Sequence, residues 1–234
     1  MQSLRGGLAA FAVGAATVLV VLALAILPFL NPLWVGFAQE RAEVAARTGL
    51  PGADVRAVTD AILADLVLGP PDFDVALAGQ PVLDEAERGH MRDVRTVFLG
   101  LYLAAAVGAL VVVAAFLVAR GRSRARLWRR LSRTGLAIAG VTVAGGLLAL
   151  VFFDAAFELF HRVLFPQGNW QFDPATDRLV QLFPQSFWVE TSVAVGIAAI
   201  VLGLALAWLG GRRAAAIERQ TAGTPATLNA VPVR

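Results

Sequence analysis

The stretch TVFLGLYLAAAVGALVVVAAFLVA, Thr96–Ala119, contains no charged residue. It is followed at once by RGRSRARLWRRLSR, Arg120–Arg133, which contains seven arginines. An α-helix rises about 1.5 Å per residue, so about 20 apolar residues cross the roughly 30 Å hydrocarbon core of a bilayer. Loops rich in arginine stay on the cytoplasmic side of a membrane. The two stretches therefore predict a membrane-spanning helix that ends at the cytoplasmic face.

Three further charge-free runs have the same character, and they cover Leu8–Leu30, Gly135–Phe153 and Thr191–Gly211. Each run is about 19 to 24 residues long, which is the length that a membrane helix requires. Glycine is frequent in these runs and suits close packing of helices in lipid. The sequence therefore predicts an all-α integral membrane protein, a four-helix transmembrane bundle with a small, mainly helical extracytoplasmic cap.

The composition supports a membrane location. Only 16% of the 234 residues are charged and 58% are hydrophobic, whereas a soluble domain has about 25% charged residues. Cysteine is absent, which excludes disulfides, thiolate nucleophiles and cysteine-ligated metals. The net charge of +3 is accounted for by the basic segment beside the second run, so it indicates no nucleic-acid partner.

The arginine distribution also predicts the topology. With the basic segment inside, both termini are cytoplasmic. A cleaved signal peptide is an alternative for the first run, but PFLNPLW, Pro28–Trp34, lacks a small-residue cleavage site, so a retained helix is favoured. The predicted segments are a first transmembrane helix at 1–30, an extracytoplasmic segment at 31–95, a second transmembrane helix at 96–119, a basic cytoplasmic loop at 120–134, a third transmembrane helix at 135–157, an extracytoplasmic motif loop at 158–190, a fourth transmembrane helix at 191–211 and a cytoplasmic tail at 212–234.

The first external segment contains an amphipathic pattern. In PGADVRAVTDAILADLVLG, Pro51–Gly69, the apolar residues Val55, Val58, Ile62 and Leu66 recur at helical spacing, with acids on the opposite side. This pattern predicts a cap helix that buries one stripe.

The only two histidines of the chain follow on predicted helical extensions of membrane spans. In DEAERGHMRDVRTVFLG, Asp84 is a plausible N-cap of a helix that runs into the second span, so His90 would lie one to two turns above the lipid. The third span is expected to extend outward in the same way through VFFDAAFELFHR, which carries His161. Both imidazoles would then lie at the same depth on the same side of the membrane.

Each histidine has a carboxylate three residues away, Asp93 after His90 and Glu158 before His161. A carboxylate beside an imidazole can orient the ring and raise its basicity, so the pair is a candidate acid–base site. A zinc site is a competing use, although two histidines without HExxH or cysteine make a poor closed site. A solvated or structural role for each histidine also remains open.

The link between the third and fourth spans is long and rich in aromatics. Trp170 and its aromatic neighbours can form an interfacial belt or the wall of a ligand pocket. Asp173 and Asp177, in FDPATDR, can be turn-formers or site residues, because Asp-Pro is a turn signal.

Two segments resemble the motif blocks of a known family. GHMRDV, Gly89–Val94, and FHRVLFPQGNWQFDPATDRLVQLFPQSFW, Phe160–Trp188, are similar to those of the lipoprotein intramolecular transacylases, called Lit. Members of that family move the sn-2 acyl chain of a diacylglyceryl-cysteine lipoprotein onto the α-amino group of the same cysteine. The resemblance implies a multi-pass acyltransferase of the bacterial cell membrane, with a diacylated lipoprotein as substrate, membrane lipids around it, and no cofactor or metal; it leaves the oligomeric state open.

The family's histidines match His90 and His161, so the resemblance implies a catalytic pair. We expect His161 to act as base and His90 as acid or oxyanion partner, although the roles could be exchanged. A non-enzymatic scaffold that binds lipid or a partner, and a lipid hydrolase, are alternatives; a transporter is disfavoured because no span carries a charge at its centre. The residues expected to orient the rings or bind substrate are Asp93, Arg92, Glu158, Asn169, Trp170, Asp173 and Asp177.

Overall fold

The computed structural model describes residues 2–222, which form two compact units. The first unit comprises Met1–Val21, Ala104–Gly140 and Ile200–Arg234, within the described part of the chain. The second comprises Leu22–Leu103 and Val141–Ala199.

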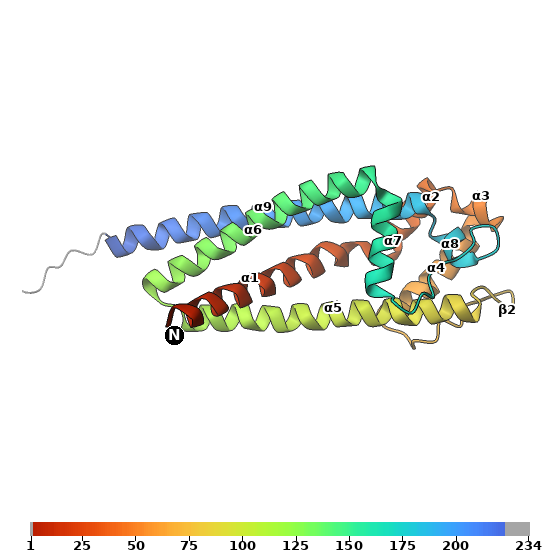
Figure 1. Ribbon diagram of the computed structural model, residues 1–234. Coiled ribbons are helices and arrows are strands. Elements are labelled where there is room, and N and C mark those ends of the chain that lie inside the picture. Colours follow the sequence, from red (N-terminus) through yellow and green to blue (C-terminus); the bar gives the residue numbers. More distant parts are fainter. Residues whose placement is uncertain (1, 223–234) are drawn as a thin grey trace, which may run out of the picture. The chain divides into compact units, whose positions relative to one another are not determined.

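Four long helices account for most of the chain (Figure 1). All four are long and apolar enough to cross a membrane, and each contributes residues to both units. The all-α fold with four membrane helices that the sequence predicts is therefore confirmed. These helices are α1 (Gln2–Ile26), α5 (Glu85–Val118), α6 (Gly121–Val151) and α9 (Gln185–Ala222).

Within the first unit, α6 and α9 approach each other through small residues. A Cβ on Gly203 would lie 2.7 Å from the carbonyl oxygen of Gly135, and one on Gly210 would lie 2.7 Å from that of Trp128. The Ser132 hydroxyl donates a hydrogen bond to a carbonyl oxygen of α9 at 2.8 Å. Glycine at these positions is therefore required by the close backbone packing, as is common between membrane helices.

The basic stretch 120–134 is helical for most of its length, because α6 begins at Gly121. The prediction of a loop there is wrong, and the reason is that arginine, alanine and leucine are all good helix formers. Arg129 in this part of α6 forms an ion pair with Glu218 of α9. The predicted tail at 212–234 is helical up to Ala222, and its remainder, 223–234, lies outside the described residues.

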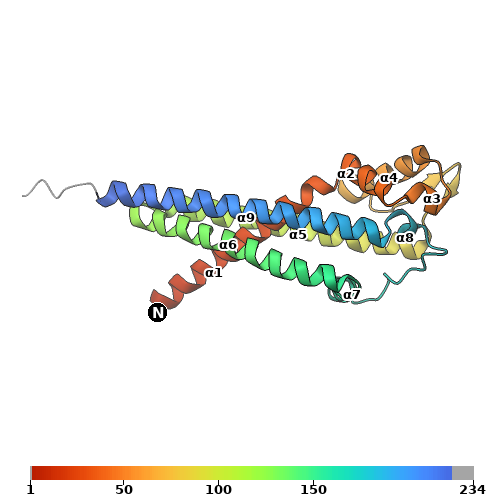
Figure 2. The same ribbon diagram turned by 90° about the horizontal axis from the view of Figure 1, so that it is seen from above.

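The second unit adds short helices and one hairpin to the ends of the long helices. In Figures 1 and 2, α2, α3, α4 and α8 gather beside the start of α5. The short strands pair antiparallel, with the first residue of one opposite the last of the other. These elements are η1 (Leu27–Phe29), α2 (Pro32–Arg41), α3 (Val44–Thr48), α4 (Gly52–Val67), β1 (Ala76–Leu77), β2 (Gln80–Pro81), α7 (Phe153–Leu164) and α8 (Arg178–Leu182).

The predicted cap helix is confirmed as α4. The four residues of its apolar stripe are between 1% and 7% exposed, and they form the centre of the unit's hydrophobic core. Phe73 and Leu182, which are fully buried, complete this core from the hairpin side and from α8. The core fixes the start of α5, and so positions the helix that carries His90.

The third span does not continue outward as one helix, and the prediction that it does is wrong. The helix breaks at Phe152, where φ is −121° and ψ is 47°, and α7 leaves α6 at a steep angle (Figure 1). On α7 the side chains of Leu159, Phe160 and Val163 are at least half exposed. An upright helix would lift these apolar side chains into water, whereas a helix that turns into the membrane surface keeps them in lipid.

Candidate active site

The two histidines meet in the second unit. His90 comes from α5 and His161 from α7, and their ring centroids lie 6.0 Å apart with the ring planes 28° from parallel. Their exposed fractions are only 7% and 8%. The fold thus brings two residues that are far apart in the sequence into one buried pair. The motif spacing alone could not show that the two rings are in contact range.

The backbone of α7 fixes the tautomer of His161. Its Nδ1 lies 2.7 Å from the carbonyl oxygen of Phe157, one turn earlier on the same helix. A carbonyl oxygen only accepts, so Nδ1 carries the hydrogen and Nε2 keeps its lone pair. Burial lowers the pKa of His161, and the hydrogen bond to Phe157 opposes this effect in part. His161 is therefore a neutral imidazole with Nε2 ready to accept a proton.

The His90 ring is packed against aromatic rings. The rings of Phe165 and Phe172 meet it edge to face at centroid distances of 4.9 and 5.6 Å. Its Nδ1 is one of the few buried side-chain atoms without a hydrogen-bond partner among the described residues. Two positive charges on rings 6.0 Å apart repel each other, so the neutral pair readily accepts only one additional proton.

Aromatic side chains also enclose His161. Trp170 lies 5.0 Å from its ring, Phe157 4.2 Å and Phe160 5.2 Å, measured between centroids. Such a site excludes water, and electrostatic interactions within it are stronger than in solution. Trp170 thus lies against the His161 ring.

Two cavities of the second unit lie away from the histidines. An apolar one of about 60 Å³ is bounded by η1, α4 and α5, and an open groove of about 560 Å³ lies between α4 and the segment that leads to β1. Neither is lined by His90 or His161. The two rings themselves are buried, with exposed fractions of 7% and 8%.

Asp93 contacts the loop that follows α7. Its Oδ2 accepts hydrogen bonds from Gln167 Nε2 at 2.7 Å and from Asn169 Nδ2 at 2.6 Å. Asn169 in turn lies beside the His90 ring. Asp93 thus ties α5 to the loop that covers the pair, which is more than the local orienting role that its spacing to His90 suggested.

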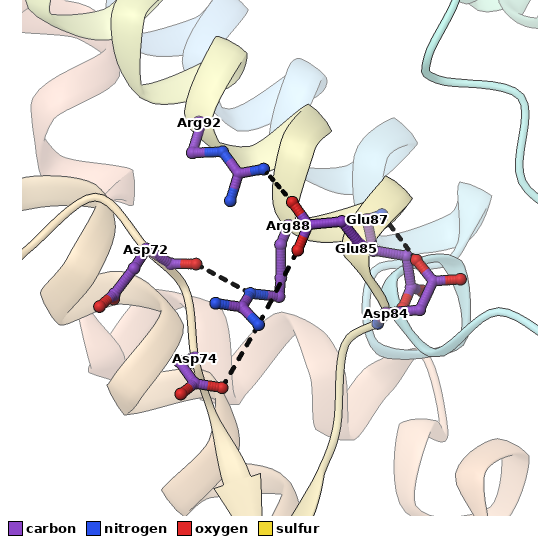
Figure 3. A network of polar contacts seen from close by, with 7 residues as sticks. All are labelled: Asp72, Asp74, Asp84, Glu85, Glu87, Arg88 and Arg92. Atoms are coloured by element: carbon purple, nitrogen blue, oxygen red, sulfur yellow. Dashed lines mark hydrogen bonds and ion pairs between the residues drawn. The ribbon is translucent and has the colours of Figure 1, made fainter.

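Two of the expected site residues point elsewhere. Glu158 accepts a hydrogen bond from Arg162 at 2.5 Å on the exposed side of α7, and the hydrogen bond of His161 goes to a backbone carbonyl instead. Arg92 pairs with Glu85 at 2.5 Å, on the outer side of α5 (Figure 3). The structure therefore does not bring these two side chains to the histidine rings.

Asp173 and Asp177 form a self-contained turn. The backbone N–H of Asp173 donates to Asp177 Oδ2 at 2.7 Å, and that of Ala175 donates to Asp173 Oδ1 at 2.9 Å. Both carboxylates are occupied within the turn, which matches the turn-forming alternative for FDPATDR.

One buried carboxylate, Glu87, was missed by the sequence reasoning. Its side chain is part of a reciprocal capping pair with Asp84, in which each carboxylate accepts the other's backbone N–H at 2.8 Å (Figure 3). Its second oxygen accepts the backbone N–H of Leu179 in α8 at 2.6 Å. The D-x-x-E spacing of a capping box was visible in DEAE and could have identified it. Glu87 therefore joins α8 to α5 one turn before His90.

Across residues 2–222, no group of three or more histidine, aspartate or glutamate side chains is placed to hold a metal ion. The ring pair by itself offers two neutral nitrogen bases in a dry, aromatic enclosure. Such a site is suited to moving protons between groups of a substrate.

Solved structures with the same fold come from a membrane protein of Bacillus cereus. The membrane integral lipoprotein intramolecular transacylase Lit matches with a TM-score of 0.75 and 17% identity, over 93% of this chain and 99% of that chain. A variant of it with one histidine replaced by arginine matches with a TM-score of 0.71 and 18% identity, over 94% of this chain and 96% of that chain. At this identity the likeness establishes the fold.

The sequence comparisons establish the family. An uncharacterized protein of Aquifex aeolicus (strain VF5) is 32% identical over 65 residues, which are 28% of this chain and 30% of that protein's length. The family model described as lipoprotein intramolecular transacylase Lit matches residues 11–188, a range that includes both histidines and the loop over them. This chain therefore belongs to the lipoprotein intramolecular transacylase family.

Proposed function

We propose that this chain is a membrane acyltransferase that moves the sn-2 acyl chain of a diacylglyceryl-cysteine lipoprotein onto the α-amino group of the same cysteine. The product is a lyso-form lipoprotein. One observation carries the proposal: the only two histidines of the chain form a buried pair whose ring centroids are 6.0 Å apart. Family membership indicates which acyl transfer the pair would serve.

The proton balance of this reaction calls for two bases. The substrate amine has a pKa of about 8 and begins as an ammonium group. After a base removes one proton, the nitrogen lone pair attacks the ester carbonyl carbon, a carbon–nitrogen bond forms, and the bond from that carbon to the glyceryl oxygen breaks. The nitrogen thereby loses two protons, of which one goes to the glyceryl oxygen and one to solvent. Two neutral imidazoles meet this requirement.

We assign the roles from the hydrogen bonds. His161 presents the lone pair of Nε2, since Nδ1–H is bonded to the Phe157 carbonyl, and it takes the proton that the nitrogen loses after attack. His90 gives a proton to the leaving glyceryl oxygen. A positioned acid or base of this kind contributes a factor of about 10²–10⁴ to the rate.

Proximity supplies a further part of the acceleration. Amine and ester belong to one molecule that is anchored in the membrane, so the attack is intramolecular. Well-oriented intramolecular reactions gain up to about 7–11 kcal/mol over their bimolecular equivalents. An acyl-enzyme intermediate is not required.

The nearly closed enclosure implies a conformational step. The loop that carries Trp170 and Phe172 covers the rings, so it must move to admit the ester and then exclude water again. Exclusion of water also favours the amine over hydrolysis of the ester.

We place the protein in a bacterial cell membrane, with both termini in the cytoplasm and the histidine pair at the extracytoplasmic face. The seven arginines of Arg120–Arg133 support this orientation. Membrane lipids would surround the four apolar helices.

The proposal is tested with purified full-length chain in lipid nanodiscs and a synthetic diacylglyceryl-cysteine lipopeptide, using mass spectrometry to locate each acyl chain. We expect His161→Asn and His90→Asn each to slow N-acylation by about 10²–10⁴-fold. Glu158→Gln serves as the control, since Glu158 pairs with Arg162 on the surface of α7, and it should retain the wild-type rate.

Two results would contradict the proposal. Wild-type rates in both histidine variants would indicate a scaffold or binding role in place of catalysis by the pair. Release of free fatty acid without an N-acylated product would indicate a hydrolase.

A further inference from the structure

Two buried polar atoms in the site lack partners and belong to neighbouring side chains. They are Nδ1 of His90 and Oδ1 of Asn169, and they make up most of the buried side-chain atoms without a hydrogen bond in the described residues. Buried polar atoms are nearly always paired, because leaving one unpaired costs about 1–3 kcal/mol. Two such atoms on adjacent side chains therefore call for an explanation.

The orientation of the Asn169 amide is determined by Asp93. Oxygen and nitrogen of an amide are hard to tell apart by shape, so the hydrogen-bond network must assign them. A carboxylate only accepts hydrogen bonds, and Asp93 Oδ2 lies 2.6 Å from Nδ2 of Asn169. The NH₂ group must face Asp93, and Oδ1 is consequently left as an acceptor on the other side of the amide.

We propose that Asn169 is a positioning residue that holds His90 in the tautomer with hydrogen on Nδ1, through a chain of hydrogen bonds from Asp93 to Asn169 to His90. The amide oxygen of Asn169, whose side chain lies beside the His90 ring, accepts from His90 Nδ1–H. Nε2 of His90 then keeps its lone pair, as Nε2 of His161 does. This role rests on the proposed function, and it explains how His90 becomes an acid.

The assignment completes the proton balance. His90 Nε2 accepts one proton from the substrate ammonium. In the resulting imidazolium, Nδ1–H donates to the Asn169 amide oxygen, and the Asn169 NH₂ group donates to the Asp93 carboxylate. This imidazolium then delivers the same proton to the glyceryl oxygen as the carbon–oxygen bond breaks. His161 takes the second proton from the nitrogen and releases it to solvent. The opposite tautomer would leave no lone pair on Nε2 to receive the first proton.

The composition of the chain makes the tautomer measurable. With only two histidines, selective ¹⁵N-histidine labelling of the full-length chain in nanodiscs gives the signals of two rings, and His161→Gln assigns them. Nitrogen shifts distinguish a protonated from an unprotonated ring nitrogen. At neutral pH we expect both rings to carry hydrogen on Nδ1.

The variants separate the proposed relay from general loop packing. Asn169→Ala and Asp93→Asn should convert His90 to a mixture of tautomers or to the Nε2–H form, while the His161 signals stay unchanged and report an intact fold. Gln167→Ala is the matched control, because Gln167 donates to the same Asp93 oxygen without reaching His90. It should leave both tautomers as in the wild type.

Either of two results overturns the proposal: His90 with hydrogen on Nε2 in the wild type, or an unchanged His90 tautomer in Asn169→Ala. This readout needs no substrate, so it stands or fails separately from the transacylase activity. A rate measurement adds a second test. The double variant Asn169→Ala/His90→Asn should be no slower than His90→Asn alone, since residues acting through one another are non-additive; additive losses would assign Asn169 a separate role.

Discussion

The two imidazoles of the site differ in what holds them. His161 is anchored within its own helix, by a hydrogen bond to a carbonyl one turn earlier. His90 has a polar neighbour from a different element, Asn169, which is tied to Asp93. Replacing the loop residues should therefore affect His90 while leaving His161 in place.

The acid limb of the activity profile should lie below pH 6.5. Burial lowers the pKa of His161 from its ordinary value of 6.5, so the neutral base persists at pH values where a solvated histidine is already protonated. We expect initial rates in nanodiscs to stay level as the pH falls through 6.5, then to decline at more acidic pH, and also to decline above about 8 as the substrate ammonium is lost. An acid limb centred at 6.5 or above would contradict the assignment.

Removal of the Glu87 carboxylate should destabilise the second unit. Glu87 is 2% exposed and accepts backbone N–H groups from both Asp84 and Leu179. Glu87→Ala leaves two donors unpaired, at a cost on the order of 2 kcal/mol. Thermal unfolding followed by circular dichroism should show a lower midpoint, with a smaller change in Glu87→Gln. Glu85→Gln, on the outer side of the same turn, is the control and should keep the wild-type midpoint.

At the scale of elements, α7 has three different faces. His161 and Phe157 face the site, Asp154, Glu158 and Arg162 form a polar stripe, and exposed apolar side chains occupy the remaining surface. A short helix with these faces fits a position in the plane of the membrane interface. That position would hold His161 at the depth of lipid ester groups.

Depth measurements can test the orientation of α7. The chain lacks cysteine, so single nitroxide labels can be attached at Leu159→Cys, Val163→Cys and Glu158→Cys without removing other thiols. Labels at the first two positions should be accessible to oxygen dissolved in lipid, and the label at the third to a water-soluble nickel complex. Equal accessibility to the nickel complex at all three positions would mean that α7 stands clear of the membrane.

A methyl group added to Gly135, where α6 and α9 are in close contact in the first unit, should destabilise the protein. A Cβ on Gly135 would collide with the carbonyl oxygen of Gly203, whereas one on Gly140 of the same helix would meet no atom within 4 Å. We expect Gly135→Ala to cost about 1–3 kcal/mol, because the backbones must separate. Gly140→Ala is the matched control and should leave the thermal midpoint unchanged or raise it. Equal midpoints for the two variants would argue against this contact.

At the scale of the whole molecule, charge rather than shape should decide the orientation in the membrane. The chain carries 20 arginines and 17 acidic residues, and the arginines cluster in Arg120–Arg133. Four helices are long and apolar enough to cross a membrane. We propose from this charge distribution that segment 120–133 is cytoplasmic and that segment 31–95 is extracytoplasmic.

Labelling in intact cells tests this topology. A membrane-impermeant maleimide should modify Gln80→Cys in β2 directly, and Arg122→Cys only after the cells are permeabilised. Gln80 is exposed, and the Arg122 substitution leaves six arginines in the basic segment, too many to reverse its charge bias. Labelling of Arg122→Cys in intact cells would place the histidine pair on the cytoplasmic side.

Sequence alone identified the spans, the α4 stripe and the two histidines. Charge-free runs and periodic apolar residues are local properties, and a helix forms from them wherever its apolar surface can be buried or placed in lipid. The break at Phe152 escaped this reasoning because no proline or glycine marks it, and because the turn depends on where the exposed side chains of α7 meet lipid.

What only the tertiary structure decided is which polar groups meet. Asp93 and Asn169 are far apart in the sequence, as are Glu87 and Leu179, and both pairs form because the core beneath α5 fixes the loops against it. Spacing along one helix suggested Glu158 as a partner of the His161 ring, and Arg92 was expected to orient the rings or bind substrate. Each instead forms an ion pair with a residue of its own helix. Hydrogen bonds act over about 3 Å, so their partners follow from packing between elements, which a local pattern does not contain.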